Sequence, residues 1–325
     1  MGEEFEAEPL KKIKVLASNP QLLETLKDKG YYTLESLAVE SPHVLLERVG
    51  ERLISLDMAK QIVREARGCL KVEIISAAEL LELEKQKKRY TTGSKALDEL
   101  LGGGVPEQEM TEFCGPYESG KTECCMTIAM LAAKDGVNTI YWDTEGGFSP
   151  GRLAKMAKAR GLAPEKILPH IYYGEVYGSE HLLFLIENTH KLLKEKEIKI
   201  LILDSFVSPF RAEYPGRELL APRQQLINRC QRRLINYMRA YKLAVITTEQ
   251  VLASPQAYAY ESRPEILNPP VGGHVVSHAV SHRVYFQKVG RTKRLATLVA
   301  SNYLPPETVA FSITERGVED VATEE

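Results

Sequence analysis

The chain has 325 residues, of which 44% are hydrophobic and 26% are charged. These values are ordinary for a globular protein and exclude wholesale disorder, collagen and fibrous repeats. No apolar run reaches the roughly 18 to 20 residues that span a bilayer, and the first eight residues are acidic where a signal peptide would be basic and then apolar. We therefore expect an intracellular protein, in which the five cysteines, none in a C-x-x-C pair, are reduced thiols.

The net charge is only −2, but the charges are distributed unevenly. Residues 219–248 and residues 266–306 contain no Asp or Glu, although both segments carry several Arg and Lys residues. Two such segments could form a positive surface of the kind that binds a phosphate backbone. The alternative is that each is the solvated face of an ordinary element.

In chain order, a flexible tail (1–8) is followed by a small helical domain (9–68). Within this domain, turn signals such as Ser18-Asn19-Pro20 and Glu40-Ser41-Pro42 separate apolar stretches with helical spacing. A charge-dense linker (69–90) follows.

The remaining residues, 91–325, are predicted to form an α/β domain. Apolar strand-like runs alternate there with helical runs, beginning with MTEFCG at 110–115 and KTECCMTIAMLAAKDG at 121–136. Further strand-like runs include NTIYWD, KILILDS and LAVITTEQ. This alternation predicts a mainly parallel sheet covered by helices.

One motif matches the phosphate-binding pattern G-x-x-x-x-G-K-[ST] and lies between a predicted strand and a predicted helix, as that pattern requires. Backbone N–H groups of such a loop bind phosphates, its Lys reaches the β and γ phosphates, and its Thr hydroxyl binds Mg²⁺. We therefore expect ATP and Mg²⁺ as ligands. The nucleotide-binding residues are Gly115, Pro116, Tyr117, Glu118, Ser119, Gly120, Lys121 and Thr122.

Three more strand ends carry polar groups suited to the same chemistry. Asp204 ends one strand and is predicted to assist Thr122 in binding Mg²⁺. Glu145 follows another strand and could deprotonate the attacking water, and Gln250 could hydrogen-bond the γ-phosphate. The alternative for Asp204 and Glu145 is an ordinary turn residue. With Lys121, Glu145 and Gln250 are the predicted catalytic residues.

The sequence resembles the archaeal RadA family of RecA-like strand-exchange recombinases. The most specific segments, besides the phosphate loop, are TTGSKALDELLGGGV (91–105), DTEGGF (143–148), FRAEYPGRELLAPRQQ (210–225), PVGGHVVSHAVSHRVYFQK (270–288) and FSITERGVED (311–320). The resemblance implies a RecA-like ATPase core, an N-terminal helix-hairpin-helix domain, and filament assembly on single-stranded DNA with pairing to duplex DNA. It also implies a cytoplasmic, nucleoid-associated protein of archaeal origin.

Further site residues follow from the resemblance. It implies that two loops bind DNA, and that Ile74 and Ala77 lie in a segment through which one subunit binds the next. His274, His278 and His282 recur every four residues, but the family has histidines here without a metal. The implied DNA-binding residues are Arg211, Arg217 and Arg223 in the first loop, and Gly272, Gly273, His274, His278 and Arg283 in the second.

Two functions remain open. The first is a DNA-dependent ATPase that forms filaments on single-stranded DNA and catalyses homologous pairing and strand exchange. The second is a recombinase paralogue that serves other recombinase subunits as a mediator, with weak ATPase activity. The predicted hairpin KVLASNPQL (14–22) lacks the family's glycines, and Ile266-Leu267 stands where the family has Asp-Pro. These departures favour the mediator, whereas the retained ATPase residues favour the enzyme.

Overall fold

The computed structural model describes residues 9–70, 74–251 and 279–322. Contacts between residues divide the chain into two units, one of residues 1–86 with 184–195 and the other of residues 87–183 with 196–325. No helix in the described residues is long and apolar enough to cross a membrane.

The first unit is helical. Its helices begin at residues that favour helix starts: Asn19 and Ser55 accept hydrogen bonds from backbone N–H groups of the first turn, and Pro20 and Pro42 occupy first-turn positions. Buried leucines, isoleucines and valines from these helices pack into one core. The elements before residue 70 are η1 (Pro9–Lys12), α1 (Lys14–Ala17), α2 (Pro20–Asp28), α3 (Leu34–Ala38), α4 (Pro42–Val49) and α5 (Leu56–Cys69).

Three more helices belong wholly or partly to this unit. Helix α6 (Ala77–Lys85) starts with a capping box in which Ser76 and Glu79 satisfy each other's backbone N–H groups. None of its side chains is buried, and Leu80, Leu81 and Leu83 are about half exposed. The other two are α11 (Ser179–Asn188), whose last five residues are in this unit, and α12 (His190–Glu195).

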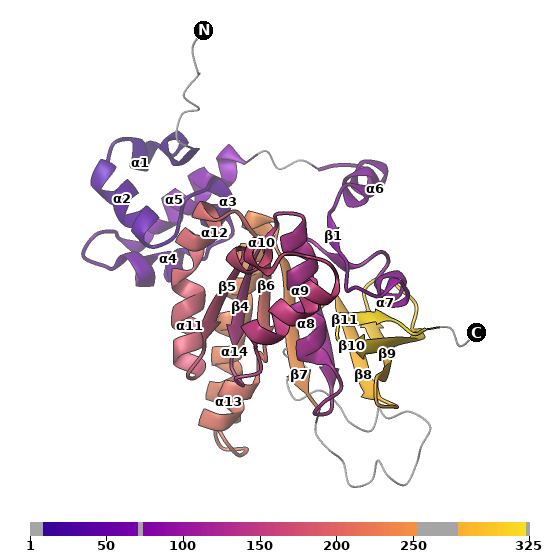
Figure 1. The fold of residues 1–325 in the computed structure, drawn as a ribbon. Coiled ribbons are helices and arrows are strands. Elements are labelled where there is room, and N and C mark those ends of the chain that lie inside the picture. Colours follow the sequence, from indigo (N-terminus) through magenta and orange to yellow (C-terminus); the bar gives the residue numbers. More distant parts are fainter. Residues whose placement is uncertain (1–8, 71–73, 252–278, 323–325) are drawn as a thin grey trace. The chain divides into compact units, whose positions relative to one another are not determined.

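The second unit contains a nine-stranded sheet in the order β11-β10-β9-β8-β3-β7-β6-β4-β5 (Figure 1). The six strands from β8 to β5 are parallel, and β9, β10 and β11 extend the sheet in antiparallel fashion. The strands are β3 (Met110–Gly115), β4 (Asn138–Asp143), β5 (Ile171–Glu175), β6 (Ile198–Asp204), β7 (Ala244–Gln250), β8 (His282–Lys288), β9 (Lys293–Ser301), β10 (Thr308–Thr314) and β11 (Gly317–Asp320). The α/β class and the mainly parallel sheet predicted from the sequence are confirmed.

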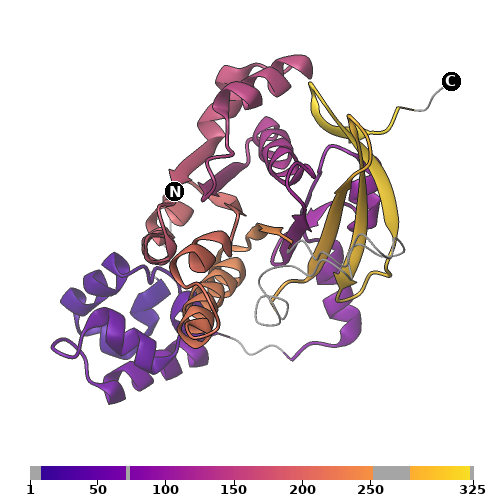
Figure 2. The same cartoon turned by 90° about the horizontal axis from the view of Figure 1, so that it is seen from below.

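Helices cover both faces of this sheet, and Figure 2 shows α8 and α14 on opposite sides. Strand β3 is buried along its whole length, as expected for a parallel strand with helices on both faces. Phe286 stacks on Phe113 and packs against Phe311, with ring centroids 5.0 Å apart in both pairs. The remaining elements are α7 (Lys95–Leu100), α8 (Lys121–Lys134), α9 (Pro150–Ala159), α10 (Pro164–Ile167), η2 (Leu168–His170), α13 (Ser208–Glu213), α14 (Leu220–Tyr241) and the pair β1 (Arg89–Tyr90) and β2 (Val105–Pro106).

The strand register brings the predicted polar groups to one edge of the sheet. Asp143 lies opposite Asp204 across β4 and β6, and Gly115 lies opposite Gln250 across β3 and β7. Because parallel strands end on the same side, all four positions are at the carboxyl edge, where open α/β sheets bind ligands.

Candidate functional site: a phosphate loop at the carboxyl edge of the sheet

The loop between β3 and α8 needs glycine at the first and sixth positions of the phosphate-binding motif. Gly115 and Gly120 both have positive φ angles, of 154° and 106°. A Cβ atom on Gly115 would lie 2.3 Å from the carbonyl oxygen of Phe286, and one on Gly120 would lie 2.4 Å from Cδ1 of Ile313. The backbone of Phe286 cannot make room for a side chain at Gly115, whereas the end of the Ile313 side chain could shift, so at Gly120 the positive φ angle is what favours glycine.

Lys121 is held inside this loop. Its Nζ donates to the carbonyl oxygens of Gly115 and Pro116, each at 2.9 Å, and lies 3.5 Å from Oγ of Ser119. Burial lowers the pKa of Lys121, and the charges of Asp204 and Glu145 partly oppose that effect. Within the described residues, the hydrogen-bond partners of its ammonium group are all neutral, and a phosphate oxygen would be a stronger one.

Asp204 ends β6 as a buried carboxylate. Thr248 donates to its Oδ1, and the hydroxyl of Tyr141 donates to its Oδ2 at 2.6 Å. Burial raises the pKa of Asp204, whereas hydrogen bonds from Thr248, Tyr141 and Thr122 act in the opposite direction. A buried carboxylate of this kind is stabilised by a cation.

Glu145 is positioned by the turn that follows β4. Oδ1 of Asp143 accepts the backbone N–H groups of residues 145, 146 and 147 at 2.9 to 3.2 Å, and Oδ2 accepts that of Phe148 at 2.9 Å. The side chain of Glu145 then accepts hydrogen bonds from Ser205 at 2.9 Å and from Gln250 at 3.0 and 3.1 Å. The carboxylate thus lies between the ends of three strands.

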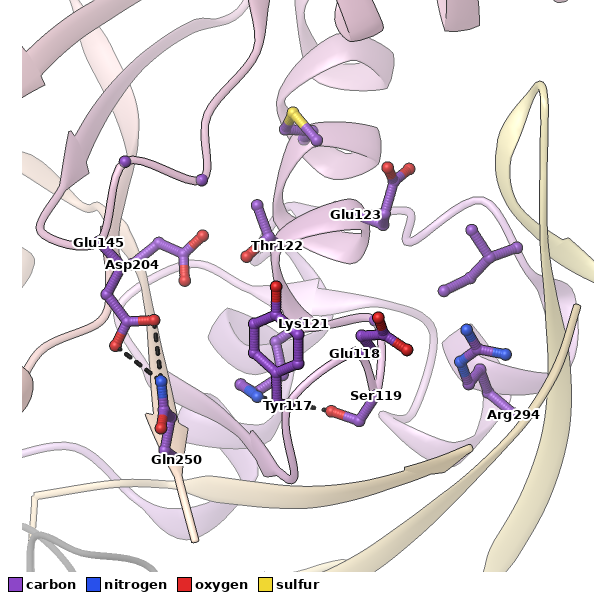
Figure 3. Close-up of a pocket in the computed structure, with 15 residues that line it drawn as sticks. Tyr117, Glu118, Ser119, Lys121, Thr122, Glu123, Glu145, Asp204, Gln250 and Arg294 are labelled. Atoms are coloured by element: carbon purple, nitrogen blue, oxygen red, sulfur yellow. Dashed lines mark hydrogen bonds between the residues drawn. The ribbon is translucent and has the colours of Figure 1, made fainter. Parts of the chain in front are cut away.

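These groups line one cavity of about 550 Å³, shown in Figure 3. Gly115 and Pro116 do not line it, but their carbonyl oxygens hold Lys121. All the other predicted nucleotide-binding, metal and catalytic residues do line it, namely Tyr117, Glu118, Ser119, Gly120, Lys121, Thr122, Glu145, Asp204 and Gln250.

The structure also assigns to this cavity residues that sequence reasoning missed. Glu123 and Met126 come from the first turns of α8, whereas Arg294 and Ile313 come from the antiparallel strands β9 and β10. The helical pair could have been found from its spacing after the loop. The other two carry no signal in the sequence, because their position depends on strand order.

Two acidic residues border this phosphate-binding region, and each is paired with a basic one. Lys288 Nζ donates to Glu118 at 2.7 Å, which lowers the pKa of that carboxyl group. Arg152 donates to Glu123 through Nε and Nη2, the latter at 2.9 Å. Their negative charges are therefore largely compensated where a polyanion would bind.

The first-loop arginines occupy different environments. Arg211, on α13, is exposed and lines a second, smaller cavity of about 50 Å³ together with Glu145 and Gln250. Arg217 is exposed in the segment after α13, and Arg223, at the start of α14, donates to the carbonyl oxygen of Tyr214 at 3.2 Å. Arg211 is thus the one that lies beside the nucleotide cavity.

Arg283 differs from the expectation of an open DNA contact. Its side chain is 12% exposed, and its guanidinium group pairs with the fully buried Glu112, with Nη2 3.2 Å from Oε2. Burial alone would lower the pKa of Arg283, but the hydrogen bonds and charge of Glu112 outweigh it and raise that pKa. This pairing argues against a phosphate contact by Arg283. The other second-loop residues, Gly272, Gly273, His274 and His278, lie outside the described residues.

Three further residues named from the sequence can be located. Ile74 is 95% exposed just before α6, and Ala77 is the first residue of that helix. His282 is buried in β8, where Ser301 and Tyr303 lie 3.0 Å from its two ring nitrogens. No cluster of three or more metal-ligating side chains occurs in the described ranges.

A comparison with known protein families supports the assignment made from this geometry. The family model described as Rad51 matches residues 84–321. The match covers more than two thirds of the chain and includes the phosphate loop, the strand ends around the cavity and the antiparallel extension of the sheet. The chain therefore belongs to the Rad51 family of RecA-type recombinases.

Proposed function

We propose that the protein hydrolyses ATP in a DNA-dependent manner, forms filaments on single-stranded DNA and catalyses homologous pairing and strand exchange. The observation that carries this proposal is the convergence of Lys121, Thr122, Asp204, Glu145 and Gln250 on one cavity. Those residues come from the ends of three strands and the start of one helix, and together they supply the main protein groups that phosphoryl transfer to water uses.

The residues present fit Mg²⁺ bound with the nucleotide. The Thr122 hydroxyl and the Asp204 carboxylate provide the oxygen ligands that this ion prefers. Burial raises the pKa of Asp204, so a nearby cation would favour its ionised form. Thr122 would bind the ion directly, and Asp204 would bind it directly or through water. When bound, Mg²⁺ neutralises part of the phosphate charge.

Glu145 is the residue we assign to the attacking water. A carboxylate held at a strand end by Ser205 and Gln250 can orient water and accept its proton. Lys121 would stabilise charge on the transferred group, replacing its present carbonyl partners with phosphate oxygens. Gln250 would exchange its bond to Glu145 for one to the γ-phosphate.

The DNA partner is inferred from charge and from family membership. Arg217 and Arg211 are exposed arginines on and beside the first loop, and guanidinium groups bind phosphates regardless of base sequence. Such binding suits a protein that accepts any strand and leaves recognition to base pairing. The exposed aliphatic side chain of Ile74 would contact the next subunit.

A mediator role is the second candidate, and one local feature favours it. At the first predicted hairpin, Asn19 caps α2 and Pro20 occupies its first turn, so a side chain rather than a glycine turn shapes this connection. That arrangement offers fewer free backbone N–H groups for DNA phosphates than a glycine-rich hairpin would.

The deciding experiment measures ATP hydrolysis with and without single-stranded DNA, alongside joint-molecule formation. Lys121→Ala should abolish hydrolysis, whereas Lys134→Ala, at the exposed end of the same helix, should leave it intact. DNA-stimulated hydrolysis with joint molecules supports the recombinase. Hydrolysis without DNA stimulation and without joint molecules favours the mediator.

A further inference from the structure

Arg294 is a buried cation at the edge of the nucleotide cavity (Figure 3). It is the second residue of β9 and only 7% exposed. Its Nη1 donates to the backbone carbonyl oxygens of Gly290, Arg291 and Lys293, at 3.1 to 3.4 Å. Its Nε is buried without a hydrogen-bond partner in the described part of the chain.

The charge of Arg294 is also poorly compensated. Burial lowers its pKa, and the only opposing effect comes from Glu118. That carboxylate is already bound by Lys288 at 2.7 Å. Burying a cation without an anionic partner is unfavourable. An anion bound in the cavity would therefore stabilise Arg294 in its buried position.

The location of Arg294 indicates which part of a nucleotide it would meet. A Cβ atom on Gly120 would lie 3.9 Å from its Nε, so the guanidinium group lies beside the start of α8. Figure 3 shows it on the opposite side of the loop from Glu145 and Gln250, which are assigned to the terminal phosphate. The side near Arg294 would therefore face the inner phosphates.

We propose that Arg294 binds an inner phosphate of the nucleotide, and so contributes to the affinity for the diphosphate and the triphosphate alike. This inference rests on the proposed nucleotide site. It differs from the roles of Glu145 and Gln250, because those act at the terminal phosphate. A guanidinium group could instead stack on the nucleotide base, and the test below separates the two.

The experiment measures the Kd values of ATP, ADP and inorganic tripolyphosphate by calorimetry, together with the Tm of the ligand-free protein. The variants are Arg294→Met, which keeps length but removes charge, and Arg294→Lys, which keeps charge. Arg291→Met is the matched control, since Arg291 lies in the same turn but is exposed. For Arg294→Met we expect all three Kd values to rise about 10- to 100-fold, with an unchanged or higher Tm.

Each outcome bears on the proposal. Intermediate weakening by Arg294→Lys, and none by Arg291→Met, supports it. A lower Tm with unchanged ligand affinity would show that Arg294 only stabilises its turn, and weaker nucleotide binding with normal tripolyphosphate binding would show a base contact. Either result overturns the proposal while leaving the ATP site intact. If the unaltered protein binds none of the three ligands, the proposed function fails as well.

Discussion

Gln250 donates its side-chain amide to both carboxylate oxygens of Glu145, at 3.1 and 3.0 Å. The two residues come from different strands, Gln250 from the end of β7 and Glu145 from the turn after β4. These hydrogen bonds engage both oxygens of a carboxylate that would otherwise face water. A nucleotide that recruits the Gln250 amide would therefore release Glu145 for catalysis.

Replacing Glu145 should separate binding from hydrolysis. Glu145→Gln keeps the shape of the side chain but removes its basicity, so we expect hydrolysis to fall about 10²- to 10⁴-fold while ATP affinity changes little. The control is Glu175→Gln, an exposed glutamate at the end of the neighbouring strand β5. Single-turnover hydrolysis and nucleotide titration measure the two effects, and a parallel loss of both would contradict the assignment.

Removing the Gln250 amide should uncouple hydrolysis from DNA. In Gln250→Ala, Glu145 loses the partner that we assign to γ-phosphate sensing, so we expect similar rates of hydrolysis with and without single-stranded DNA. Gln86→Ala, at an exposed helix end, serves as the control. If Gln250→Ala retained full DNA stimulation, the sensing role would be wrong.

Asp204 should leave a signature in the pH dependence of stability. Because burial raises its pKa above the usual 3.8, the folded protein binds more protons than the unfolded chain between those two pKa values. The Asp204 contribution to the free energy of unfolding therefore falls as pH rises through that interval, by at most about 1.4 kcal/mol per pH unit. Asp204→Asn should remove this contribution. Urea unfolding of both ligand-free proteins across this pH range tests it, and parallel profiles would refute the expectation.

The first-loop arginines should be detectable by salt titration. Each phosphate contact to single-stranded DNA contributes about 0.7 to the slope of log K against log salt concentration. Arg217→Ala should therefore make the slope shallower by about that amount, whereas Lys155→Ala on the exposed face of α9 should not. An unchanged slope would remove Arg217 from the DNA site.

Arg283 should behave as a structural residue. Arg283→Ala leaves Glu112 as an uncompensated buried charge, so we expect the free energy of unfolding to fall by about 3 to 5 kcal/mol. The double variant Glu112→Leu with Arg283→Met should recover most of that loss. Denaturant unfolding measures both. A stable Arg283→Ala protein with weakened DNA binding would instead restore the original expectation for this residue.

Much of the candidate site could be predicted from the sequence because its residues follow local rules. The phosphate loop has a fixed spacing, and Glu145, Asp204 and Gln250 each come at or just after the end of an apolar strand. Parallel strands bring such ends together whatever their exact order. That is why the phosphate loop and these three strand ends can be assigned to one site from the sequence.

The remaining features depend on strand order and on partners far away in the sequence. Residues 266–306 contain no acidic residue, yet Arg283 faces Glu112 because β8 lies beside β3 in the sheet. Arg294 likewise reaches the nucleotide cavity only because β9 follows β8 in antiparallel pairing. The edge strand β5 was missed because it is short and only half buried, so its hydrophobic pattern is weak.

The carboxylate of Asp143 accepts hydrogen bonds from four consecutive backbone N–H groups, from Glu145 to Phe148. Because these four hydrogen bonds hold its main chain, the turn has little freedom to change conformation. Any response to an incoming ligand must then come from rotation about side-chain bonds, which takes picoseconds to nanoseconds where a side chain is exposed. A catalytic cycle on this scaffold would consequently begin with its catalytic turn already assembled.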